Sequence, residues 1–142
     1  MAADFLNNGL PHLLVWSEST GLQLHTNQGN GNHGIFLQLI GHRKVHNPGG
    51  ESSRTNADGI GAVARVQTAD HHATVENGTV SAGLGASRLP LVLGTGRHVQ
   101  PDVLRIRWPD TVPQAEFNVR PGQLTQLEED NRKVTSCPTL FT

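Results

Sequence analysis

The chain of 142 residues has little of the residues that mark several common protein classes. It has no tyrosine, and its one cysteine, Cys137, can form neither an internal disulfide nor a cysteine-based zinc site. Its net charge of -1 lacks the basic excess with which a general nucleic-acid binder neutralises phosphates. No apolar run approaches the roughly 20 residues of a membrane-spanning helix. We therefore expect no nucleic-acid partner and no membrane span.

Glycine and proline, by contrast, are abundant. The chain has 16 glycines and 8 prolines, whereas charged residues make up 16% of it and aromatic residues 4%. Glycine and proline destabilise helix interiors and are common in turns. No stretch of ten residues has helical periodicity, and short alternating segments lie between turn-forming residues instead. This pattern predicts an all-β fold, an antiparallel β-sandwich of jelly-roll-like type.

Two segments near the N-terminus predict a small hairpin. Residues 13–16 form a continuous apolar run, residues 22–25 alternate in polarity, and a polar turn lies between them. Residues 27–32 are all Asn, Gln or Gly, which indicates a boundary. We expect residues 1–26 to be poorly anchored, or to pack on the sandwich opportunistically.

Later segments predict the strands of the sandwich. Alternation places Leu104, Ile106 and Trp108 toward the core and Arg105 and Arg107 on the outer side. The proline inside 89–93 favours an edge position or a strand start for that segment. The predicted strands cover residues 35–40, 60–67, 73–80, 89–93, 103–108, 114–119 and 124–127.

The end of the predicted sandwich contains two further patterns. The apolar residues Ala115, Phe117 and Val119 alternate with polar ones, so we expect them on one face of a strand. The acidic residues 128–130 are typical of a solvated terminal run.

The sequence contains no catalytic motif in the structural context that such a motif requires. Residues 59–64 match the G-x-G-x-x-A fingerprint of dinucleotide sites, but a polar loop precedes them and a strand is expected after them. No G-x-S-x-G nucleophile motif occurs. A metal-dependent enzyme using His42, His46, Asp70 and His71 is the weakest hypothesis that the eight histidines allow. We predict no catalytic residue, no resident cofactor and no enzymatic activity.

Residues 4–12 have the outline of an oxygen-rich calcium loop. Asp4, Asn8 and Gly9 fit the pattern D-x-[DN]-x-[DN]-G-x-x-D. Leu6 and His12, however, occupy positions where oxygen ligands are expected. Because Ca²⁺ takes six or more oxygens, we interpret this as a degraded loop that keeps its turn, with Asp4 and Asn8 as weak candidate ligands.

Two short motifs resemble a known family. The first consists of Asp58, Gly59, Ile60 and Gly61, and the second of Arg107, Trp108, Pro109 and Asp110. In this order they resemble the characteristic elements of the ASPIC/UnbV domain, and the resemblance covers residues 32 to 130 or so. Thr111 departs from the pattern, because the family has a glycine after its Trp-Pro-Asp.

The N-terminal part is similar to the end of an FG-GAP/VCBS repeat, the blade of an integrin-like β-propeller. This resemblance implies three parts: a partial repeat and linker over 1–31, an ASPIC/UnbV-like sandwich over 32–130, and a truncated extension over 131–142. The extension is similar to a subset found in large bacterial multidomain proteins. We therefore expect a fragment of a longer chain, whose repeats could bind Ca²⁺.

The resemblance implies a non-catalytic binding or adhesion module of a secreted or cell-surface protein. Its partners would be the parent chain's propeller repeats and a protein or glycan ligand. A lectin-like sandwich is the alternative, with Trp108 as a stacking platform beside Arg105 and Arg107, although the phase of Trp108 favours a core position.

Overall fold

The computed structural model describes residues 1–6, 8–42, 55–79 and 90–130, and it confirms the predicted all-β fold. The described residues form strands and no helix, so none of them builds a helix that could cross a membrane. The strands are β1 (Ala2–Ala3), β2 (His12–Ser17), β3 (Gly21–His25), β4 (His33–Ile40), β5 (Val63–Gln67), β6 (His72–Glu76), β7 (Leu91–Gly96), β8 (Val103–Arg107), β9 (Pro113–Glu116) and β10 (Leu124–Glu128).

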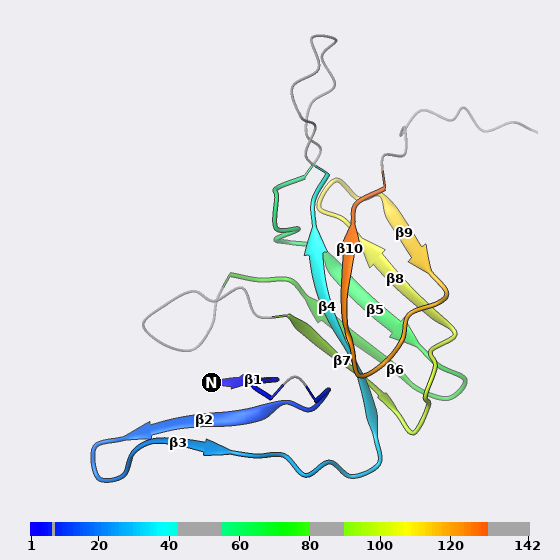
Figure 1. The fold of residues 1–142 in the computed structure, drawn as a ribbon. Helices are drawn as coiled ribbons and strands as arrows, with labels where there is room; N and C mark the ends of the chain where they lie inside the picture. Colours follow the sequence, from blue (N-terminus) through cyan, green and yellow to red (C-terminus); the bar gives the residue numbers. More distant parts are fainter. Residues whose placement is uncertain (7, 43–54, 80–89, 131–142) are drawn as a thin grey trace, which may run out of the picture.

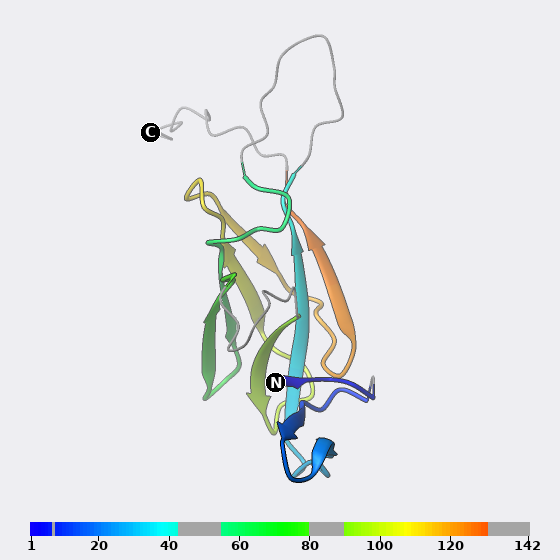
Figure 2. The ribbon, with the colours of Figure 1, turned by 90° about the vertical axis from the view of Figure 1, so that its left-hand side faces the viewer.

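The strands from β4 onward form two sheets that pack face to face as a sandwich (Figures 1 and 2). One sheet has the order β10-β4-β7 and the other β6-β5-β8-β9. All pairs are antiparallel except β10 with β4, which run parallel. This pair departs from the purely antiparallel arrangement that the sequence predicts. Residues 117–123 carry the chain from β9 to the edge of the other sheet, so β10 enters beside β4 and runs in the same direction.

The core consists of residues that alternate along the strands, as predicted. Ile35, Leu37 and Leu39 of β4 are buried, and Leu104 and Ile106 of β8 face them from the other sheet. Each such side chain contributes about 1.5–3 kcal/mol on burial, so this interface between the sheets dominates the stability of the domain. The other buried apolar members of the core are Ala62, Ala64, Val66, Leu93, Trp108 and Val119.

The prediction that Ala115, Phe117 and Val119 share one face of a strand is wrong in part. Ala115 is exposed and Phe117 is 64% exposed, whereas Val119 is buried. The register places Ala115 opposite Arg105 on the outer face, and it places Gln114 opposite Ile106 on the core face. Gln114 is only 4% exposed, so a polar residue occupies a core-facing position of β9.

Strand boundaries differ from the prediction where turns compete with strand pairing. Residues 59–62 form a turn closed by a hydrogen bond from the Ala62 N–H to the Gly59 oxygen at 3.0 Å, so β5 begins at Val63 rather than at Ile60. β7 extends to Gly96, and among the described strands it pairs only with β4, which confirms its edge position.

The predicted hairpin is confirmed as β2 and β3, and the short β1 pairs with the other side of β2. Among the strands, β2 and β3 contact only each other and β1 (Figure 1). The loop before β2, in contrast, rests on the sandwich. A Cβ on Gly9 would lie 2.9 Å from the Gly122 Cα, so the two backbones touch.

Candidate functional site

The two family-like motifs meet at one end of the sandwich. Gly59 has a φ of 61°, and a Cβ there would lie 3.0 Å from both the Leu39 Cβ and the Trp108 Cζ3. Gly61 has a φ of 90° and lies against the Pro109 ring. Both positions require glycine, because L side chains rarely adopt this backbone conformation and at Gly59 a side chain also lacks room. The motif residues thus fit the first turn closely against the end of β8.

Two asparagines hold this turn in place. Asn56 Oδ1 accepts the Ile60 N–H at 2.7 Å, and Asn56 Nδ2 donates to the Ile60 oxygen at 2.8 Å. Asn77, directly after β6, donates through Nδ2 to the Asp58 oxygen at 2.7 Å. Ile60 is half-buried in the turn. These bonds satisfy the backbone of the first motif, whose role here is structural.

The structure confirms the core position that alternation along the strand predicts for Trp108. It is 2% exposed, and its Nε1 donates to Gln114 Oε1 at 2.8 Å. Gln114 Oε1 also accepts the Asp130 N–H, and Gln114 Nε2 donates to Glu116 Oε1 and to the Glu128 oxygen. This buried amide links β8, β9 and the end of β10. Trp108 therefore presents no accessible ring face on which a sugar could stack.

Asp110 and the exposed arginines complete the second motif. Asp110 Oδ1 accepts the Val112 N–H at 3.0 Å and thereby closes the turn between β8 and β9. Thr111 in this turn has a φ of 72°, a conformation that favours glycine. Arg105 and Arg107 lie exposed on the outer face of the sheet, as predicted.

Glu129 contradicts the expected solvated run, because it is 3% exposed. Its Oε2 accepts the His42 N–H at 3.0 Å and a hydrogen bond from Thr55 Oγ1. Its Oε1 is buried and has no hydrogen-bond partner among the described residues. The signal for its inward position lies in the sequence, because Leu127 and Glu129 continue the alternation of β10 toward the core.

The calcium-like loop is closed by hydrogen bonds within the protein. Asp4 accepts the Asn8 N–H at 3.1 Å and the Gly9 N–H at 2.9 Å. The buried His12 ring accepts the Asn27 N–H at Nδ1, so its proton lies on Nε2 and is donated to Asn8 Oδ1 at 3.1 Å. The oxygens of the two predicted ligands, Asp4 and Asn8, thus accept protein hydrogen bonds, and the imidazole bridges the loop to the linker.

The described residues of the metal-enzyme hypothesis, His42, Asp70 and His71, do not form one cluster of ligands. Asp70 bonds to His98 Nε2 at 2.5 Å, and this hydrogen bond, with the charge of His98, lowers the pKa of Asp70. His42 lies by Glu128 instead, and His46 falls outside the described residues. Within the part of the chain that the structure describes, no three His, Cys, Asp or Glu side chains form a group that could hold a metal ion.

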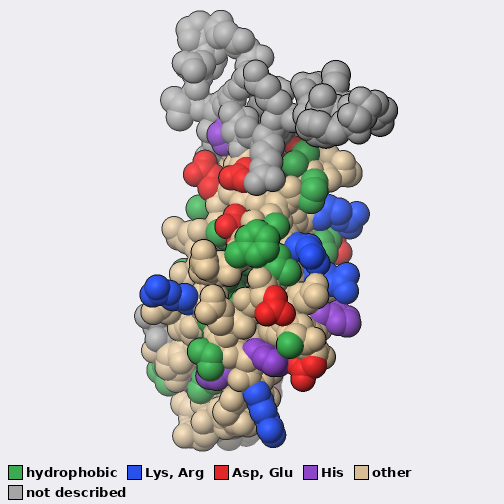
Figure 3. Space-filling view, turned by 90° about the vertical axis from the view of Figure 1, so that its right-hand side faces the viewer, with side chains coloured by type: hydrophobic (Ala, Val, Ile, Leu, Met, Phe, Trp, Pro, Cys, Tyr) green, Lys and Arg blue, Asp and Glu red, His purple; other side chains and the backbone are tan. Residues whose placement is uncertain are grey.

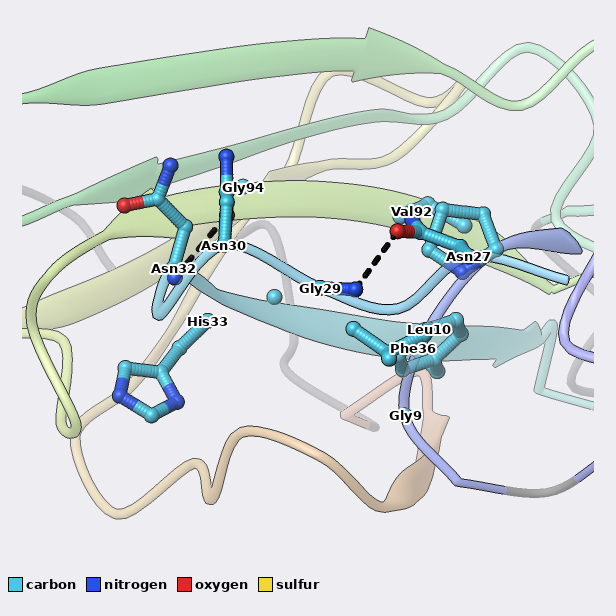
Figure 4. Close-up of a pocket in the computed structure, with 12 residues that line it drawn as sticks. Gly9, Leu10, Asn27, Gly29, Asn30, Asn32, His33, Phe36, Val92 and Gly94 are labelled. Atoms are coloured by element: carbon cyan, nitrogen blue, oxygen red, sulfur yellow. Dashed lines mark hydrogen bonds between the residues drawn. The ribbon is translucent and has the colours of Figure 1, made fainter.

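A cleft of about 310 Å³ lies where the N-terminal loop and linker cross the outer face of β4 and β7 (Figure 4). Leu10 and Phe36 lie together at one end, and Asn30, Asn32 and His33 stand at the other. The amide oxygens of Asn27 and Asn30 accept the N–H groups of Gly29 and Asn32, which orders the linker. Apart from these residues the lining consists of Gly9, Pro11, Gly34, Val92 and Gly94.

The polar groups that line the cleft include uncharged side-chain amides. Asn27 and Asn30 are exposed next to an apolar wall that includes Val92, which is 41% exposed. Amides beside apolar surface suit ligands that combine hydroxyl groups with apolar faces. Sequence reasoning treats residues 27–32 as a boundary and misses the cleft, because the cleft arises only when the linker folds across the sheet.

Comparison with known proteins gives one match. The family model described as "ASPIC and UnbV" matches residues 51–134, more than half of the chain. No curated protein and no solved structure matches the chain significantly.

Proposed function

This chain belongs to the ASPIC and UnbV family, and from that premise we propose that it is a non-catalytic binding or adhesion module of a larger protein. In this proposal the parent protein is secreted or displayed at the cell surface, and FG-GAP repeats precede the sandwich. The hairpin is then the last part of those repeats. It docks on the preceding β-propeller through its own strands.

The observation that supports this proposal is the apolar face of the hairpin. The register pairs Leu14 with Leu24 and Trp16 with Leu22, so these four side chains share one face. Trp16 and Leu22 are each 67% exposed, and Leu24 is 42% exposed. A contiguous apolar face of this kind marks an interaction site, and β3 also has an edge with no strand partner among the described residues.

Tryptophan fluorescence of a longer chain tests the proposal. Extending the chain upstream by the preceding repeats should bury Trp16 and shift its emission to shorter wavelength. Trp108 is buried in both forms and contributes a constant background, which the variant Trp16→Phe isolates. If Trp16 emits as a water-exposed residue in the extended chain, the hairpin does not dock on the repeats.

The cleft favours a second candidate function, the recognition of a neutral glycan. The supporting observation is the group of exposed asparagines beside Val92, which replaces the platform expected at Trp108. Neutral glycan arrays probed with the chain test this. The double variant Asn30→Ala, Asn32→Ala should lose any signal, whereas Asn118→Ala, an exposed asparagine far along the sequence, should keep it. Equal loss in both variants would refute recognition at the cleft.

A further inference from the structure

The outer face of the four-stranded sheet carries three arginines from two neighbouring strands. Arg65 of β5 lies directly opposite Arg105 of β8, and Arg107 follows two residues along β8. All three are exposed, because they alternate with core residues of the same strands. In the space-filling view, blue side chains gather along the right-hand margin of the molecule (Figure 3).

Among the described residues, these arginines have few acidic neighbours on their own face. Within the described residues no carboxylate forms an ion pair with any of them, and Arg105 Nη1 donates to the neutral Gln67 Oε1 at 3.0 Å. Among the described strand residues of this face, Glu76 is the one acid, and it lies opposite Val63 and diagonal to Arg65, with which it forms no ion pair. Like charges directly opposite each other destabilise an antiparallel pair. An anionic ligand would relieve the repulsion between Arg65 and Arg105.

The spacing of the arginines suits a ligand with several charges. Directly opposite residues lie about 4.5–5.5 Å apart, and alternate residues along a strand lie about 6.6–6.8 Å apart. A guanidinium binds carboxylate or sulfate in a bidentate manner, with defined geometry. The face is therefore suited to a polymer that repeats its negative charge, rather than to a single small anion.

The other side chains of this face narrow the class of polymer. Among its described strand residues, this face has no Phe, Trp or Tyr on which a nucleobase could stack, and His72 has its one aromatic ring. Its apolar members, Val63, Val103, Ala115 and Pro113, are small. The described strand residues of this face include no large apolar anchor of the kind that dominates peptide interfaces. Both β5 and β8 are central strands, so their backbones cannot pair with an added strand.

We propose that the arginine face, defined by Arg65, Arg105 and Arg107, binds an acidic polysaccharide. The proposal goes beyond the module function. The arginine face belongs to one sheet, whereas the cleft lies on the outer face of the other sheet and the hairpin lies apart from both. Failure of either earlier proposal leaves this one testable.

Titration of the full chain with oligogalacturonate at low salt tests the proposal. The chain should bind, and the binding should weaken as salt is raised, because exposed charge interactions are screened. The double variant Arg105→Gln, Arg107→Gln should weaken binding by about tenfold or more for each charge-assisted hydrogen bond that it removes. The matched control Arg97→Gln, Arg120→Gln removes two exposed arginines from loops and should keep the affinity within about twofold.

Three results would overturn the proposal. The first is the absence of binding to oligogalacturonate. The second is an equal loss of affinity in the control variant, which would show that net charge alone drives the association. The third is equal or tighter binding of duplex DNA or polyglutamate, which would assign the arginine face to another class of polymer. Neutral dextran should show no binding in the same titration.

Discussion

At the scale of single residues, the family-like motifs work as packing and hydrogen-bonding devices. Gly59 lets the first turn approach Trp108, and Gln114 satisfies the indole N–H inside the core. A buried donor without a partner costs about 1–3 kcal/mol, so the polar Gln114 stabilises the core by accepting the hydrogen bond of the Trp108 indole. The two family-like motifs thus stabilise the fold. The side chains proposed to bind ligands lie instead in the cleft and on the arginine face.

Thr111 gives the first residue-scale prediction. Its φ of 72° is unfavourable for a residue with a Cβ, by about 1–2 kcal/mol. Because the family has glycine at this point of the turn, Thr111→Gly should raise the free energy of unfolding by about 1 kcal/mol in urea denaturation. Thr79→Gly, at an exposed residue without positive φ, should lower the free energy of unfolding or leave it unchanged. Equal gains in both variants would show that the backbone of Thr111 is not strained.

The second residue-scale prediction concerns Asp70 and His98. The hydrogen bond from His98 lowers the pKa of Asp70, so the interaction stabilises the folded state above the unfolded-state pKa of Asp70. This contribution is lost as the pH falls through the lowered, folded-state pKa. His98→Gln should therefore raise the pKa of Asp70 toward its ordinary value, as carboxyl-carbon NMR titration can measure. An unchanged titration of Asp70 would contradict the hydrogen bond.

At the scale of elements, short strands are stabilised by the turns and partners that fix their register. β5 begins only after the turn of residues 59–62, and β10 pairs in parallel with β4 because the chain crosses between the sheets. The hairpin β2–β3 is held together by the pairing of its own two strands, and its apolar face is exposed. Each element is therefore defined locally, whereas its partner is set by the path of the chain.

Gly59→Ala tests the junction between two elements. The added Cβ would meet Leu39 and Trp108 at 3.0 Å and would also adopt an unfavourable φ of 61°. We expect a loss of about 2–4 kcal/mol in the free energy of unfolding, from overpacking and backbone strain together. The control Gly94→Ala lies in β7, where a Cβ has open space and φ is not positive, and should change stability by less than about 1 kcal/mol. Similar losses in both variants would contradict close packing specific to Gly59.

At the scale of the whole molecule, a sandwich with its own core carries an appended hairpin. The core lies between the two sheets, and β2 and β3 contact none of their strands. The N-terminal loop covers Phe36 on the outer face, which is 4% exposed although it does not belong to the core between the sheets. The two candidate binding surfaces lie on opposite sheets of this sandwich.

Deletion of residues 1–26 tests this division. The shortened chain should keep the dispersed NMR spectrum of a folded sandwich, because the core does not include the hairpin. It should be less stable by about 1–3 kcal/mol in thermal or urea unfolding, since Phe36 becomes exposed to solvent. Resonances of β8 serve as an internal control and should shift little. A collapsed spectrum would show that the hairpin belongs to the cooperative unit.

Part of this protein could be predicted from the sequence alone. Alternation identified the all-β class, the hairpin and the inward phase of Leu104, Ile106 and Trp108, because a strand side chain has just two directions and burial selects the apolar one. The order of the two family-like motifs identified the family. These properties depend on the spacing of residues close together in the chain, which can be read from a single sequence.

Other features were decided by tertiary structure. The inward position of Gln114, the burial of Glu129 and the pairing of Arg65 with Arg105 depend on which residues face each other across strands distant in sequence. The cleft depends on the path of a glycine- and asparagine-rich linker across the outer face of a sheet. Local sequence patterns do not encode these contacts, because the register and packing between distant segments depend on the free energy of the whole fold.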